Sequence, residues 1–151
     1  MIHLLDTDTF IVLLRGTAIT RAKTQRQEMV KRSAVKILAA CKKRESEGHL
    51  IGLSAITLAE LEFGLQHGEN PETQQSALRK VLAPFGKFPF DCAGCVHHYG
   101  LIRSRLESKG SGIGPLDTLI AAQAMALGAV LVTHNVKEFK RIDGLAIEDW
   151  A

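Results

Sequence analysis

Three carboxylates stand in stretches of the sequence that are otherwise apolar. Asp6 follows a short apolar run at the start of the chain, Glu60 lies inside the apolar stretch 55–61, and Asp117 lies one turn into a nearly uncharged stretch. Residues 110–136 contain no lysine or arginine. Burying a carboxylate costs several kcal/mol unless a cation meets it. A divalent cation such as Mg²⁺ or Mn²⁺, which takes carboxylate oxygens and keeps waters, would satisfy such a cluster.

Each of these acids also has an ordinary structural explanation. Asp6 is suited to cap a helix that follows it, and Asp117 near a helix N-terminus gains from the helix dipole. Glu60 is explained equally well by pairing with a lysine or by reaching out to solvent. A shared metal site therefore requires a fold that brings the three acids together, and their spacing in the sequence does not show this.

Predicted strands alternate with predicted helices along the chain. Short apolar runs bounded by turn residues predict strands at 2–5, 49–53, 88–90, 129–133 and 145–147. Helical spacing and capping residues predict helices at 20–47, 54–67, 71–84, 92–108, 116–127 and 136–140. Pro89 makes the third strand an edge strand, because proline cannot donate to a sheet ladder. This order predicts an α/β fold with a parallel sheet covered on both faces, and a site beyond the carboxyl ends of the strands.

Length and composition exclude several classes of protein. The chain has 151 residues, of which 46% are hydrophobic and 23% charged, which favours one globular domain over residues 1–151 rather than a disordered, collagen-like or disulfide-rich protein. Apolar runs are well short of the ~18 residues of a membrane span, so no membrane partner is expected. Two aspartates in the first eight residues argue against a signal peptide. Three cysteines cannot all pair within the chain, which fits a reducing cytoplasm.

The net charge of +3 hides an uneven distribution. Residues 21–44 carry nine basic side chains against the single acid Glu28, so this segment is +8 and the remainder of the chain is −5. Such a segment indicates either a polyanionic partner or a solvated helix face. If the partner is a nucleic acid, the candidate phosphate-binding residues are Arg21, Lys23, Arg26, Lys31 and Arg32.

Three separated motifs resemble the VapC-type PIN-domain ribonucleases, which are the toxins of bacterial toxin–antitoxin pairs. They are LLDTDTFIVLLRG, LSAITLAELEFGL and GIGPLDTLIAAQAMALGAVLVTHNVKEFKRIDGLAIEDW, and they occur in the family order over nearly the whole chain. Residues 15–47 are longer and more basic than the family pattern. The resemblance implies a three-layer α/β/α sandwich around a parallel sheet. It also implies a metal-dependent endoribonuclease that cuts RNA such as tRNA and forms a homodimer held inactive by a small antitoxin protein.

The resemblance also implies roles for particular residues. Asp6 and Asp117 would hold Mg²⁺ or Mn²⁺, and Glu60 would position a water or assist its deprotonation. Asn135 occupies a fourth position that is often acidic in the wider family, and it adds no charge of its own. It is expected to orient a water or to offer its amide oxygen, with Thr133 in support.

Two alternatives come from other functional classes. The sequence Asp6-Thr7-Asp8-Thr9 also fits the opening motif of haloacid-dehalogenase-type phosphatases, in which the first aspartate is a nucleophile. Those enzymes need an acidic pair after a later strand, and the segment after 129–133 lacks one. A non-catalytic RNA-binding module on the same fold is the other alternative, although it would not need to keep the three acids.

The pair Cys92 and Cys95 has CxxC spacing, with His97 and His98 nearby. A zinc site would require a second pair of ligands, and only Cys41 remains among the cysteines. The favoured interpretation is therefore that these are small residues buried in a helix.

Overall fold

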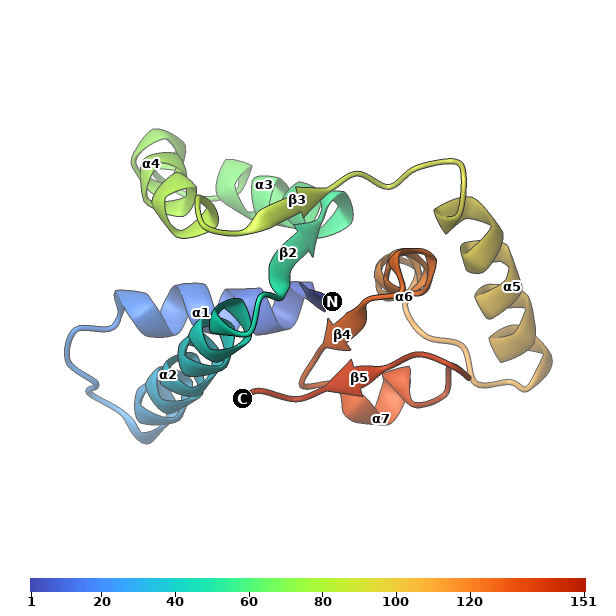
Figure 1. The fold of residues 1–151 in the computed structure, drawn as a ribbon. Coiled ribbons are helices and arrows are strands. Elements are labelled where there is room, and N and C mark those ends of the chain that lie inside the picture. The colour runs from blue at the N-terminus through green and yellow to red at the C-terminus, as the bar shows by residue number, and fades with distance from the viewer.

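The computed structural model describes all 151 residues and has an α/β architecture (Figure 1). The strands are β1 (Ile2–Leu5), β2 (Leu50–Ser54), β3 (Gly86–Phe88), β4 (Val130–Val132) and β5 (Ile147–Glu148). The helices are α1 (Thr7–Ala18), α2 (Gln25–Ser46), α3 (Ala55–Gln66), α4 (Pro71–Leu82), α5 (Cys95–Ser108), α6 (Pro115–Leu127) and α7 (Val136–Phe139). None of these helices combines the length and the apolar character that crossing a membrane requires.

All five strands form one parallel sheet in the order β3-β2-β1-β4-β5. The chain builds outwards from β1 through β2 to β3 and then returns to the other side of β1 with β4 and β5. The order of the strands therefore reverses between β1 and β4. In open parallel sheets, ligands bind beyond the carboxyl ends of the strands at this reversal.

The two faces of the sheet carry separate apolar cores, because consecutive strand residues point to opposite faces. Leu4 and its neighbour Leu131 face the layer of α5, α6 and α7, whereas Leu5 and Val132 face the layer of α1, α2 and α3. Figure 1 shows α1 and α2 on one side of the sheet and α5 and α6 on the other. The predicted three-layer α/β/α sandwich is confirmed.

The largest difference from the predicted elements is at residues 7–24. The predicted helix 20–47 begins only at Gln25, where the Thr24 hydroxyl accepts a hydrogen bond from the backbone N–H of Gln27. Ahead of it lies α1, which packs closely along α2. A side chain at Gly16 would collide with Ala34, so glycine at this position allows the two helices to approach.

Smaller differences concern the ends of other elements. The edge strand β3 ends at Phe88, so Pro89 follows the strand instead of lying inside it. The last strand is Ile147–Glu148 and not 145–147, and α5 begins at Cys95 instead of residue 92. These shifts leave the order of the elements as predicted.

Candidate acidic active site

Asp6 lies where the order of the strands reverses. Its backbone N–H donates to the carbonyl of Val132 at the end of β4. Its side chain caps α1, since Oδ1 accepts from the backbone N–H of Thr9 at 2.9 Å. The expected helix-capping role is therefore present. The Asp6 side chain is nonetheless buried at the carboxyl end of the central strand β1, with 2% of the residue exposed, and no cation pairs with it.

Thr133 fixes the second oxygen of Asp6. The buried Thr133 hydroxyl donates to Asp6 Oδ2 at 2.5 Å and accepts from the backbone N–H of Asn135 at 2.9 Å. Burial raises the pKa of Asp6 above its ordinary value, and the hydrogen bonds from Thr133 and Thr9 act in the opposite direction. The carboxylate is thus held in one orientation at a considerable desolvation cost.

Asp117 lies in the first turn of α6, which begins at Pro115. The pKa of its half-buried carboxyl is raised from 3.8 to about 6, first by burial and then by the negative charges of four other carboxylates. Those four acids come from three helices: Asp6 and Asp8 lie at the start of α1, Glu60 lies in α3 and Glu138 lies in α7. We call these four together with Asp117 the acidic site. The fold thus brings together the three acids that interrupt apolar stretches of the sequence.

Glu60 reaches the acidic site from α3, and α1 holds its side chain. The Thr7 hydroxyl donates to Glu60 Oε1 at 2.7 Å and lies 3.0 Å from the buried hydroxyl of Thr57. Glu60 has no lysine partner. The alternative that Glu60 pairs with a lysine is therefore wrong.

Asn135 acts through a neighbouring acid that was not among the candidates predicted from the sequence. Its amide Nδ2 donates to Glu138 Oε2 at 2.8 Å, while its backbone N–H donates to Thr133. Glu138 is three residues further on in the short helix α7, so the two side chains share one face. This i,i+3 spacing was the available signal. Asn135 has no charge, although its position is often acidic in the family, but it orients the carboxylate of Glu138.

The carboxylates are near enough for their charges to act on Asp117, but their oxygen atoms do not form a closed set of metal ligands. No three His, Cys, Asp or Glu side chains lie close enough together to hold a metal ion in this arrangement. Hydrogen bonds donated by Thr133, Thr9, Thr7 and Asn135 fix the carboxylates of Asp6, Glu60 and Glu138 one by one. The chemistry of the donors nevertheless fits a hard divalent cation, because every group is a carboxylate and no lysine or arginine neutralises any of them.

The basic residues proposed to bind nucleic acid do not join the acidic site. Arg21 and Lys23 lie in the loop between α1 and α2, which is at the other end of α1 from Asp6. A helix of 12 residues is ~18 Å long, so this loop is remote from the carboxylates. None of the five candidates, Arg21, Lys23, Arg26, Lys31 and Arg32, forms an ion pair.

Comparison with known proteins identifies the class. The profile of the family described as "PIN domain" matches residues 4–145, which is nearly the whole chain. The chain belongs to the PIN-domain family. This membership decides against the phosphatase alternative, which matched at one motif only.

Relatives narrow the likeness to the VapC group of that family. "Ribonuclease VapC2" of Rickettsia felis is 43% identical over 105 residues, which cover 70% of this chain and 78% of that protein. The "tRNA(fMet)-specific endonuclease VapC" of Shigella flexneri is 34% identical over 99 residues, covering 66% of this chain and 74% of the relative.

Solved structures show the same likeness over the full length. The VapBC2 complex of Rickettsia felis bound to a promoter DNA fragment contains a chain that is 34% identical, with a TM-score of 0.76 and complete coverage of both chains. The DNA-bound VapBC complex of Salmonella typhimurium gives 30% identity and a TM-score of 0.80, covering 100% of this chain and 99% of the other.

Proposed function

We propose that this chain is an endoribonuclease and the toxin of a toxin–antitoxin pair, and that it hydrolyses RNA phosphodiester bonds at the acidic site. The observation that carries the proposal is the set of carboxylates gathered around Asp117, which have no cationic partner within the chain. Membership of the PIN-domain family and the VapC ribonuclease relatives support the same activity.

Asp6 and Asp117 are the proposed ligands of Mg²⁺ or Mn²⁺. A bound ion of this kind supplies activation of a water and neutralisation of the charge that develops on the phosphate. The side chains of the chain itself do the positioning. Thr133 holds Asp6, and Asn135 holds Glu138 so that its carboxylate faces the same space.

Glu60 is the proposed group that takes a proton from the attacking water. Thr7 donates to one of its oxygens, so the other oxygen remains able to accept. The water oxygen then bonds to phosphorus, the bond from phosphorus to the leaving oxygen breaks, and the leaving oxygen gains a proton from solvent. This route needs no side-chain nucleophile.

A transfer RNA in the cytoplasm is the proposed substrate, because one relative is named as a tRNA(fMet)-specific endonuclease. The unpaired basic residues of 21–32 are proposed to bind phosphates of the RNA remote from the cleaved bond. Such contacts would add affinity without reading the base sequence.

A small antitoxin is the proposed inhibitor, and the chain is proposed to form a homodimer. The antitoxin proposal rests on the VapBC complexes among the similar structures. The homodimer rests on the resemblance to the VapC family alone.

The direct test is cleavage of a tRNA(fMet) transcript, with the ends of the products mapped. Replacing Asp6 by Asn keeps the size of the side chain at the end of β1, and it removes a charge, a metal ligand and one of the two acceptor oxygens. We expect cleavage to fall roughly 10³-fold, corresponding to several kcal/mol of transition-state stabilisation. The matched control is Asp143→Asn, since the Asp143 side chain is 81% exposed and pairs only with Lys109.

Full activity in the Asp6→Asn variant would contradict the proposed function. A wild-type protein that binds the transcript without cutting it at any Mg²⁺ or Mn²⁺ concentration would favour the non-catalytic RNA-binding module instead.

A further inference from the structure

The strand β5 supports the acidic site although it contributes no side chain to it. It has only two residues and lies at the edge of the sheet. Its Glu148 carbonyl accepts the backbone N–H of Thr133 at 2.9 Å. Thr133 in turn donates to Asp6 and accepts from the backbone of Asn135. The position of Glu148 therefore bears on the residue that orients Asp6.

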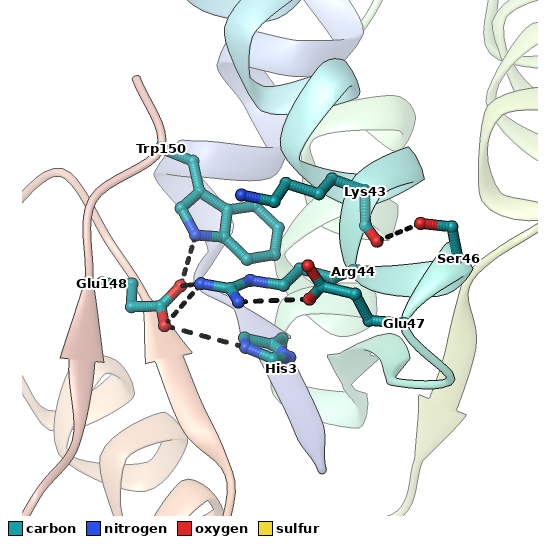
Figure 2. Close-up of polar contacts among 7 residues, drawn as sticks. All are labelled: His3, Lys43, Arg44, Ser46, Glu47, Glu148 and Trp150. Carbon is teal, nitrogen blue, oxygen red and sulfur yellow. Dashed lines mark hydrogen bonds and ion pairs between the residues drawn. The ribbon is translucent and has the colours of Figure 1, made fainter.

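So short an edge strand needs other contacts to stay in place, and the Glu148 side chain supplies them. Figure 2 shows its carboxylate between α2 and the end of the chain. Arg44 Nη2 lies 3.0 Å from each of the two carboxylate oxygens, and the Trp150 indole N–H donates to Oε2 at 2.7 Å. His3 on β1 is also nearby, with its Nε2 atom 3.9 Å from Glu148 Oε1. We call Arg44, Glu148 and Trp150 the Glu148 clamp.

The charged groups of the Glu148 clamp are partly shielded from water, and Arg44 has a second acidic partner. The side chains of Arg44 and Glu148 are 30% and 32% exposed, and Arg44 also contacts Glu47. Burial acts to raise the pKa of Glu148, but the bonds from Trp150 and Arg44 hold the pKa below its ordinary value. Glu148 therefore stays charged at neutral pH and tied to α2.

We propose that Glu148 is a positioning residue for RNA hydrolysis: the Glu148 clamp fixes β5 against α2, β5 fixes the Thr133 amide, and Thr133 fixes Asp6. The proposal rests on the proposed function of the acidic site. Glu148 touches no substrate in this scheme. Its carboxylate acts at one end of a chain of hydrogen bonds that ends on Asp6.

The test replaces Glu148 by Gln, which keeps the size of the side chain and removes the charge that Arg44 meets. We expect kcat for the tRNA(fMet) transcript to fall about tenfold while KM stays within about twofold, because substrate binding is untouched and the reacting geometry is loosened. The control is Glu107→Gln. It breaks the exposed Arg103–Glu107 ion pair of α5, whose side chains are 56% and 61% exposed, and it should leave kcat unchanged.

A second readout does not depend on activity. Amide hydrogen exchange, followed by NMR on the metal-free protein, should be faster at Thr133 in Glu148→Gln and unchanged there in Glu107→Gln. Titration of Mn²⁺ should show several-fold weaker binding in Glu148→Gln. These two measurements stay informative even if no RNA is cut, so failure of the clamp and failure of the proposed function are distinguishable.

Trp150→Phe provides a variant with a smaller change, since it keeps an aromatic ring and removes the indole N–H. It should lower kcat in the same direction and by less. Unchanged Thr133 exchange in both clamp variants would overturn the proposal. Loss of activity that only parallels the fraction of unfolded protein would overturn it as well, since that outcome assigns Glu148 to general stability.

Discussion

Glu148 and the acidic site lie in the same α/β domain, but the groups around their carboxylates are opposite in kind. Glu148 meets Arg44 and Trp150, and these partners keep its pKa low. Asp117 is half-buried and has only carboxylates as charged neighbours, so burial first and their negative charges second raise its pKa to about 6. Glu148, which does not contact the substrate, has its cation within the chain. The carboxylates of the acidic site have no such partner, which supports the proposal that a cation binds there from outside.

The hydrogen bonds make the same distinction. Around Glu148, the Arg44 guanidinium neutralises the charge, and the Trp150 indole N–H helps to orient the carboxylate. Around the acidic site, the donors are two hydroxyls, one side-chain amide and one backbone N–H, which orient the carboxylates without neutralising them. Neutral donors hold the acids in place and keep the site negative, so the site remains suited to a divalent ion.

The sharpest way to break this comparison is to remove the charge of Asp117. We expect Asp117→Asn to lower RNA cleavage roughly 10³-fold. In the metal-free protein at pH 7, we expect the same change to raise the free energy of unfolding by ~1–2 kcal/mol, allowing for solvent screening of a half-exposed group. Urea denaturation with activity measured on the same preparation tests both.

Stability and activity should change in opposite directions because the Asp117 carboxylate lowers the free energy of unfolding but is needed for RNA cleavage. Asp143→Asn is again the control and should change neither quantity. Lower stability in Asp117→Asn would contradict the view that this carboxylate is unpaired, whatever happens to the activity.

A third region extends the comparison to charges of the opposite sign. The basic residues of 21–32 have no ion-pair partners, and the Lys31 ammonium donates to the backbone carbonyl of Thr20. We expect the combined variant Arg21→Glu, Lys23→Glu and Arg26→Glu to weaken binding of tRNA(fMet). The dependence of log K on log salt should become shallower by ~0.7–0.9 for each phosphate that the variant no longer neutralises.

This is the smallest of the expected effects, since these residues bind phosphates and not the reacting atoms. The salt dependence of binding is measured by fluorescence titrations at several salt concentrations. They use the Asp6→Asn background to prevent cleavage of the RNA. An unchanged slope would make this segment a solvated helix surface only.

The sequence predicted the acidic site in part, and the physical reason is clear for each residue. Asp6, Glu60 and Asp117 were visible because each interrupts an apolar stretch, and a parallel sheet was expected to place its site beyond the carboxyl ends of the strands. Glu138 was not singled out because its neighbours Lys137 and Lys140 make it resemble an ordinary charge on an exposed helix. Its place in the acidic site follows from the hydrogen bond that Asn135 donates to it and from its effect on the pKa of Asp117.

The fold was predicted to the level of element order and layers, and the misplaced boundaries have local causes. The helix α1 was expected only as a helix that Asp6 would cap and was given no bounds, because the polar residues Asp6 to Thr9 after the strand are also typical of a turn. The clamp was not predicted at all. Arg44 and Glu148 are 104 residues apart, and nothing in either local sequence indicates that they meet.

The most direct test of the central claim is the stability of the purified, metal-free chain as a function of pH, with and without Mn²⁺. The pKa of Asp117 is raised from 3.8 to about 6 in the folded state. The free energy of unfolding should therefore be greatest below pH 4 as far as this group is concerned, and should fall as the pH rises towards 7. Saturating Mn²⁺ should restore the stability at pH 7 and should do so far less in Asp6→Asn. Stability that is independent of Mn²⁺ at pH 7, with wild-type and Asp6→Asn proteins behaving alike, would contradict the claim that the acidic site binds a divalent ion.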